Sequence, residues 1–143
     1  MSAELAEALA AAALNPTERR AIARIVGLLE DELGPELLAV WLYGSRARGE
    51  ADPGETDFDR RSDIDMMAIV GPGRDADDFR WSFTPKLVAA VEAEGDSPPF
   101  YSLKIYPVGW LVDRRRIRSF FFQEVDRDKV VLAGSDLDGE EYR

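Results

Sequence analysis

The sequence of 143 residues contains neither histidine nor cysteine. These two absences exclude a Ser-His-Asp triad, a thiol nucleophile, and zinc-finger or haem ligation. Because no disulfide can form, the sequence is silent on the redox compartment. Any catalysis must therefore come from carboxylates, hydroxyls, lysine, arginine or the backbone, or from a hard metal ion held by oxygen atoms.

Basic residues are outnumbered, with 18 Lys and Arg against 28 Asp and Glu, so the formal net charge is −10. Such a field disfavours binding to nucleic acid. No apolar run approaches the roughly 18 residues that span a membrane. Residues 1–14 are rich in alanine, carry Glu4 and Glu7, and lack the basic start of a signal peptide. The sequence therefore predicts a soluble, cytoplasmic protein that makes no membrane contact.

Apolar content is sufficient for a core, because 45% of the residues are hydrophobic. The length fits one domain, since domains typically run to about 100–200 residues. We therefore expect a single domain over residues 1–143, with an extra N-terminal helix at 1–14 and an acidic tail at 134–143.

Hydrophobic periodicity and turn residues predict an alternation of helices and strands. Asn15 and Glu18 stand at the two positions of a helix capping box, with Pro16 at the first helical position. The order α-α-β-β-α-β-α predicts an α+β fold, a small mixed β-sheet packed with helices. The expected elements are helices over 3–14 and 16–33, strands over 37–43 and 64–70, a helix opened by Thr84-Pro85 and closed at Gly95, a strand over 100–106, one helix capped by Asp113 and running through Val125, and a short strand over 130–132.

The first chemical feature is the turn Gly44-Ser45, which ends the strand 37–43. Glycine lets the backbone approach a ligand closely, and Arg46 and Arg48 begin a short helix just after it. Free N–H groups, a hydroxyl and nearby guanidinium groups together suit a phosphate. A plain strand-to-helix turn with solvated arginines has the same sequence, so the turn alone leaves both interpretations open.

The second feature is the pair Asp63 and Asp65 at the start of the strand 64–70. Residues two apart on a strand share a face, so their carboxylates lie side by side and repel unless a cation neutralises them. Two carboxylates plus substrate phosphates are the usual ligands of Mg²⁺. The same Asp-x-Asp triplet recurs at 57–59, 126–128 and 136–138. Only the triplet at 63–65 leads directly into an apolar, strand-like run.

Together and in this order, Gly44-Ser45-Arg46-Ala47-Arg48-Gly49 and Ser62-Asp63-Ile64-Asp65 resemble the minimal nucleotidyltransferases (MNT-type) of the DNA polymerase β-like superfamily. The resemblance is close over residues 36–70 and looser to about 133. It implies a nucleotidyltransferase-like fold and Mg²⁺-dependent transfer of a nucleoside monophosphate, AMP from ATP, to an acceptor. It also implies roles for six residues. Gly44, Ser45, Arg46 and Arg48 would bind the nucleotide phosphates, while Asp63 and Asp65 would be catalytic and hold the metal.

Two departures from the family pattern bear on activity. The 17 residues from Arg46 to Ser62 exceed the usual spacing, and residues 53–59 resemble an inserted turn. Active members also carry a third acid on the neighbouring strand, where we match Ser102. Lys104, on the same face as Ser102, could pair with a phosphate, offset the charge of the two aspartates, or reach solvent.

Two outcomes follow from the missing third acid. The chain is either an active transferase, with a base supplied by Asp57, Asp59 or the substrate, or a catalytically impaired nucleotide-binding or partner-binding module.

The resemblance also indicates a partner. Small stand-alone members of the family often act beside a HEPN-type toxin, and some serve as antitoxins that add AMP to it; the size and acidity of this chain fit that arrangement.

Aminoglycoside-modifying relatives usually have an added substrate domain, for which 143 residues leave little room. An interaction module that uses the N-terminal helix is a further alternative. A nucleic-acid surface at Arg114-Arg115-Arg116 and Arg118 is disfavoured, because Phe120-Phe121-Phe122 is expected to pack that helix down with its arginines solvated.

Overall fold

The computed structural model describes residues 1–49 and 62–143. The helices are α1 (Ala3–Ala11), α2 (Pro16–Leu33), α3 (Ser45–Arg48), α4 (Ala76–Ala93), α5 (Val108–Arg116) and α6 (Phe120–Asp128). The strands are β1 (Leu37–Tyr43), β2 (Ile64–Val70), β3 (Tyr101–Pro107) and β4 (Val130–Gly134). Short 3₁₀ turns occupy Gly34–Glu36, Pro98–Phe100 and Glu140–Tyr142. Across the described ranges, no helix is both long and apolar enough to cross a membrane.

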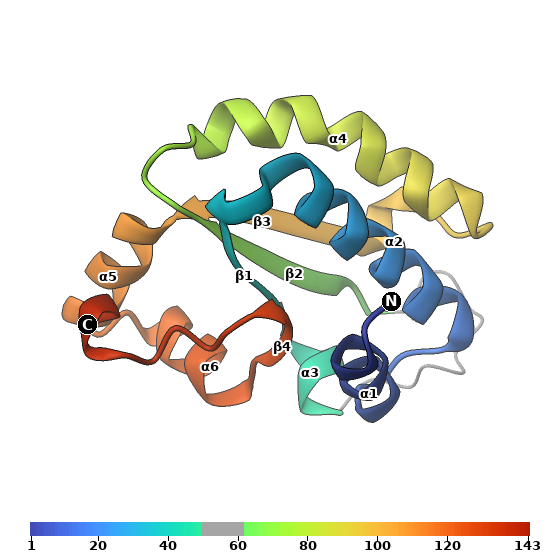
Figure 1. The fold of residues 1–143 in the computed structure, drawn as a ribbon. Helices are drawn as coiled ribbons and strands as arrows, with labels where there is room; N and C mark the ends of the chain where they lie inside the picture. Colours follow the sequence, from blue (N-terminus) through green and yellow to red (C-terminus); the bar gives the residue numbers. More distant parts are fainter. Residues whose placement is uncertain (50–61) are drawn as a thin grey trace.

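The four strands form one sheet in the order β3-β2-β1-β4. β1 runs antiparallel to β2 and to β4, whereas β2 and β3 are parallel. Helices α2 and α4 lie over one face of the sheet, and α5 and α6 lie on the other side (Figure 1). This arrangement confirms the predicted α+β fold with a mixed sheet.

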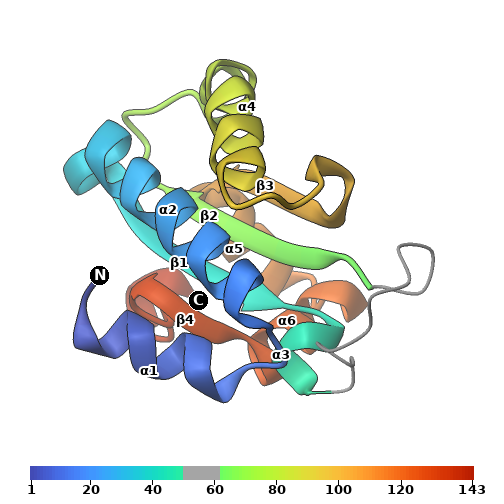
Figure 2. The same ribbon diagram turned by 90° about the vertical axis from the view of Figure 1, so that its right-hand side faces the viewer.

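Alternation along β1 and β2 divides the buried residues into two cores. Val40 and Leu42 belong to the core beneath α2 and α4. Trp41 and Met67 belong to the other core, which Leu111 of α5 and residues of α6 complete. Because both faces of the central strands are covered, β1 reads as an unbroken apolar run. Figure 2 shows α1 on the far side of β4 from α4, where its buried leucines close the first core.

Local sequence signals fix the start of α2 as predicted. The Asn15 side chain accepts a hydrogen bond from the backbone N–H of Glu18 (2.8 Å), and the Glu18 carboxylate accepts one from the N–H of Asn15 (2.9 Å). The capping box is therefore confirmed. The strands at 37–43 and 64–70 are also confirmed residue for residue.

The prediction that Thr84-Pro85 opens a helix is wrong. Helix α4 begins at Ala76, where the Asp75 side chain accepts from the N–H of Asp78 (3.0 Å), and Pro85 lies inside the helix. Proline costs an interior hydrogen bond. Burial of Phe79 and Phe83, whose rings stack at 5.3 Å, holds the first half of the helix onto the sheet and outweighs that cost.

The single helix expected from Asp113 through Val125 is two helices. Asp113 lies inside α5, and the chain turns at Arg118, whose φ of 54° is left-handed. Ser119 then caps α6 by accepting from the N–H of Phe122 (3.4 Å). The aromatic packing expected here is only partly present, because Phe122 is buried while Phe120 is 80% exposed.

The segment expected as an acidic tail packs against the sheet. Leu137 is buried in the second core. The indole N–H of Trp41 donates to the carbonyl of Ser135 at 2.9 Å. These contacts make residues 135–137 part of the folded domain.

Candidate functional site

The glycine-serine turn and the aspartate pair meet at one end of the β1-β2 ladder. Tyr43, the last residue of β1, pairs with Asp65. Gly44 follows with a left-handed φ of 80°, and a Cβ atom there would lie 2.7 Å from Oδ2 of Asp65. Only glycine both adopts this conformation and leaves room for the carboxylate. The sheet register thus places the two motifs in contact.

A cavity of about 160 Å³ opens at this point. Arg48, at the end of α3, lines the cavity together with Asp65, while Asp63 lies exposed just before β2. Ser45 begins α3 directly beside Gly44 and is half-buried. The residues that line the cavity are Tyr43, Gly44, Arg48, Asp65, Phe121, Glu124 and Val125.

The pKa of Asp65 lies above its ordinary value. Partial burial is the main cause, because it disfavours the charged form, and the neighbouring charge of Asp63 adds to it. The cations of Lys104 and Arg48 oppose the shift without cancelling it. A further cation would therefore stabilise the ionised form of Asp65, and a metal ion is one such cation.

Tyr43 contributes a hydroxyl that lacks a partner. Its Oη atom is buried and forms no hydrogen bond within the described part of the chain. Burial, and then the charge of Asp65, raise the pKa of Tyr43 well above its ordinary value, so the phenol keeps its proton. A buried donor at the wall of a cavity that Arg48, Asp65 and Glu124 also line is suited to a ligand acceptor, because an unsatisfied group otherwise costs about 1–3 kcal/mol.

The residue that we match to the third acid of the family lies beside Asp65 in the sheet. Ser102 is the direct partner of Asp65 in the parallel β2-β3 ladder. Two residues on, the Lys104 ammonium lies 5.8 Å from the centre of the Tyr43 ring and 5.2 Å from that of Phe121. Of the alternatives left open for Lys104, the structure therefore disfavours the one in which it reaches solvent, and the two in which its charge acts at the site remain.

Arg46 does not reach the cavity, although the sequence suggested a phosphate ligand. Its side chain is completely buried. Nη1 donates to Glu18 Oε1 (2.6 Å) and to the Ala13 carbonyl (3.1 Å), while Nε and Nη2 donate to the hydroxyl and carbonyl of Ser62 (2.8 and 3.0 Å). These bonds make Arg46 a positioning residue that fastens the chain just before Asp63.

Glu124 is a cavity residue that sequence reasoning missed. It lies on α6, and its spacing of three from Phe121 and one from Val125 is consistent with a shared helical face, which is the signal that could have identified it. Among residues 1–49 and 62–143, no three acidic residues are close enough to hold a metal ion by themselves. Asp57 and Asp59, the other suggested bases, lie outside the described residues.

No protein-family model matches the chain, and no curated protein does. Among solved structures, it is similar to a mutant form of the toxin-antitoxin MntA-HpeT (22% identity over 85% of this chain and 78% of that chain, TM-score 0.47). It is also similar to a toxin-antitoxin with AMP-PNP (23%, 84% and 78%, TM-score 0.48).

A third similar structure is a provisionally assigned nucleotidyltransferase from Sulfolobus solfataricus (18% identity over 96% of this chain and 93% of that chain, TM-score 0.44). These names agree with the resemblance that the two motifs indicate. At such identities and TM-scores, however, the similarity carries no argument about the site, which rests on the geometry described above.

Proposed function

We propose that the chain binds a nucleoside triphosphate at the Asp65 cavity and transfers its nucleoside monophosphate to an acceptor. The observation that carries the proposal is the contact between Gly44 and the Asp65 carboxylate. This contact places a turn whose backbone a phosphate can approach closely next to a carboxylate that can bind a metal ion. Arg48, which also lines the cavity, supplies positive charge for phosphate oxygens.

The donor set fits Mg²⁺. Asp63 and Asp65 offer two hard oxygen ligands, and their mutual repulsion favours a bound cation. Two carboxylates suffice when phosphate oxygens of the substrate complete the coordination. When bound, the ion would neutralise phosphate charge and orient the α-phosphate. Gly44 and Ser45 would contact the terminal phosphates, and the Tyr43 hydroxyl would donate to the ligand.

The transfer itself requires an acceptor oxygen to attack the α-phosphorus. The bond from that phosphorus to the bridging oxygen breaks, pyrophosphate leaves, and the acceptor loses its proton. Ser102 cannot accept a proton at neutral pH. Glu124 is the carboxylate of the cavity wall that metal binding leaves unused, so we assign proton acceptance to it.

The family resemblance implies that the nucleotide is ATP. It also implies that the acceptor is a hydroxyl group of a HEPN-type partner protein. A second function competes with transfer. Ser102 pairs with Asp65 at the position where the family resemblance implies an acid, and the Lys104 ammonium lies nearby. Both features favour a module that binds the nucleotide without efficient transfer.

Calorimetric titration with ATP, with and without Mg²⁺, tests binding. The double variant Asp63→Asn/Asp65→Asn should lose the Mg²⁺-dependent component. Asp77→Asn/Asp78→Asn removes the same charge from an exposed turn of α4 and should bind as the unaltered chain does. Equal binding by both variants would refute the proposed site.

Measuring pyrophosphate release in the presence of ATP and a HEPN-type partner protein then distinguishes nucleotide transfer from nucleotide binding alone. Release that falls in Glu124→Gln while ATP binding persists supports transfer. Binding without release supports the nucleotide-binding module.

A further inference from the structure

A second cavity, of about 170 Å³, lies at the corner between α5 and α6. Helix α6 separates it from the Asp65 cavity, and the two share no lining residue among those described. Figure 1 shows α5, α6 and the C-terminal segment gathered on this side of the molecule. In a chain with a net charge of −10, four arginines line this one cavity. The lining residues are Arg114, Arg115, Arg118, Phe122, Gln123, Asp126 and Arg143.

Two of these arginines are neutralised within the fold. Arg115 binds Asp126 through two hydrogen bonds (2.9 and 3.1 Å) and reaches Asp138 at 3.2 Å. Arg143 forms an ion pair with the Asp138 carboxylate at 3.8 Å and donates to the carbonyl of the same residue at 3.0 Å. Lys129 adds a further contact to Asp126 at 2.8 Å. The two carboxylates are thus already matched by cations, and they do not cancel the charge of the remaining arginines.

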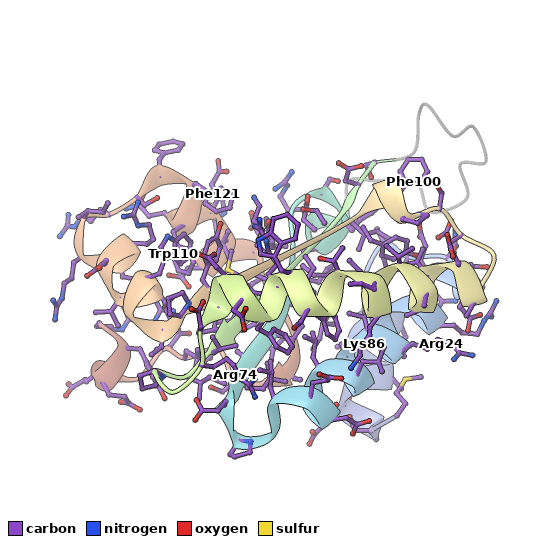
Figure 3. The ribbon with its side chains drawn as sticks, turned by 90° about the horizontal axis from the view of Figure 1, so that it is seen from above. Arg24, Arg74, Lys86, Phe100, Trp110 and Phe121 are labelled. Carbon is purple, nitrogen blue, oxygen red and sulfur yellow. The ribbon has the colours of Figure 1, made fainter. Side chains whose placement is uncertain are left out.

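Arg114 is one of those remaining arginines. Its Nε atom is buried and has no hydrogen-bond partner in the described part of the chain. Its guanidinium stacks at 5.7 Å from the centre of the Trp110 ring, a contact that orients the group without using its N–H donors. Figure 3 marks Trp110 on the same side of the molecule as Phe121 of α6. A buried donor without an acceptor requires an explanation, and a bound anion supplies one.

Arg118 is the second arginine of the cavity that no carboxylate of the described residues neutralises, and its backbone conformation is unusual for an arginine. The N–H of Ser119 donates to the carbonyl of Arg114 (3.0 Å) and that of Arg118 to Arg115 (3.2 Å), which forms a Schellman motif at the end of α5. The left-handed position of this motif usually holds glycine, yet here it holds Arg118 with φ 54°. Within the described residues, its guanidinium forms neither a hydrogen bond nor an ion pair, so no contact in the fold explains the arginine.

We propose that this cavity, which we name the arginine pocket, binds a phosphate group of a small ligand, independently of the nucleotide site. Planar guanidinium groups match phosphate oxygens through paired hydrogen bonds. Arg114 and Arg118 supply two uncompensated charges, which suits a dianion. The exposed amide of Gln123 supplies a further donor.

The test is titration of the metal-free full chain with inorganic phosphate, followed by calorimetry and by the NMR signal of the Arg114 Nε–H group. Substitution Arg118→Gly removes the guanidinium while giving the backbone its preferred residue. We expect binding about tenfold weaker, the equivalent of one charge-assisted hydrogen bond, with a melting temperature no lower than that of the unaltered chain.

Arg116→Gln is the matched control, because Arg116 is an exposed neighbour on α5 outside the pocket. It should bind phosphate within about twofold of the unaltered chain. A nucleoside 5′-monophosphate in a parallel titration, followed through the Arg114 Nε–H signal so that binding at the Asp65 cavity is not counted, distinguishes free phosphate from a phosphate ester: only the ester shifts this signal at lower concentration if the pocket recognises more than the phosphate. Equal affinities of the Arg118→Gly and Arg116→Gln variants, or an unmoved Arg114 signal at millimolar phosphate, would overturn the proposal.

Discussion

The guanidinium of Arg46 lies 2.6 Å from the carboxylate of Glu18, and both side chains are completely buried. Glu18 is at the same time the third residue of α2 and half of its capping box. Arg46 also holds Ser62, the residue before Asp63. One buried ion pair therefore joins the start of α2, the turn after β1 and the entry to β2. The position of Asp63 and Asp65 therefore depends on the Arg46–Glu18 ion pair, although neither Arg46 nor Glu18 lines the cavity.

Replacing Glu18 by Gln should destabilise the fold by about 3–5 kcal/mol, because it leaves the Arg46 charge buried without its counterion. Urea denaturation measures the loss. The double variant Glu18→Leu/Arg46→Met removes both charges and should recover much of it. A single variant within about 1 kcal/mol of the unaltered chain would show that the pair contributes little.

Replacing Gly44 by Ala should destabilise the chain by about 1–2 kcal/mol and weaken ATP binding. The left-handed backbone disfavours any Cβ, and this one would meet Asp65 Oδ2 at 2.7 Å. Gly27→Ala is the matched control, since Gly27 lies within α2 with no atom within 4 Å of its added Cβ. That control should stabilise the helix by about 0.5–1 kcal/mol. We expect the melting temperature to fall in the Gly44 variant and to rise in the Gly27 variant. Equal shifts of the two melting temperatures would contradict this prediction.

Replacing Tyr43 by Phe should separate stability from binding. Loss of a buried hydroxyl without a partner should leave the free energy of unfolding unchanged or raise it by up to about 1–3 kcal/mol. Loss of the donor should weaken ATP binding. Tyr106→Phe, which alters a ring stacked on Trp110 outside the cavity, should leave ATP affinity unchanged. Full affinity in the Tyr43 variant would remove this residue from the site.

Replacing Asp65 by Asn should raise the melting temperature of the metal-free chain at neutral pH. The folded pKa of Asp65 lies above its unfolded value, so ionisation of this group opposes folding. Its favourable contribution is complete below the ordinary carboxyl pKa and disappears as pH rises through the raised value. The gain from Asn should therefore shrink as pH falls through this window. Melting curves between neutral and acidic pH test this, and a gain independent of pH would contradict it.

The β1-β2 core and the aspartate motif were predictable because their signals are local. Apolar runs bounded by glycine specify the strands at 37–43 and 64–70, and Asn15 and Glu18 specify the start of α2 within four residues. Strand alternation likewise predicted that Ser102 and Lys104 share a face. Gly44-Ser45 and Asp63/Asp65 could be singled out as candidates because the first pair directly follows a predicted strand and the second occupies alternate positions at the start of another.

Other features depended on partners distant in the sequence. Arg46 was predicted as a phosphate ligand, and only the folded chain brings Glu18, 28 positions away, against it. Burial of Phe79 and Phe83 carries a helix through Pro85 against its local preference.

The same dependence places Glu124 at the Asp65 cavity and gathers Arg114 and Arg118 in the arginine pocket, because each cavity is lined by residues of more than one element. The sequence by itself determined the strands, the caps and the aspartate motif, since short-range hydrogen bonding and periodicity suffice for these. Tertiary structure decided which charged side chains are buried and which line a cavity, since burial requires surfaces from several elements at once.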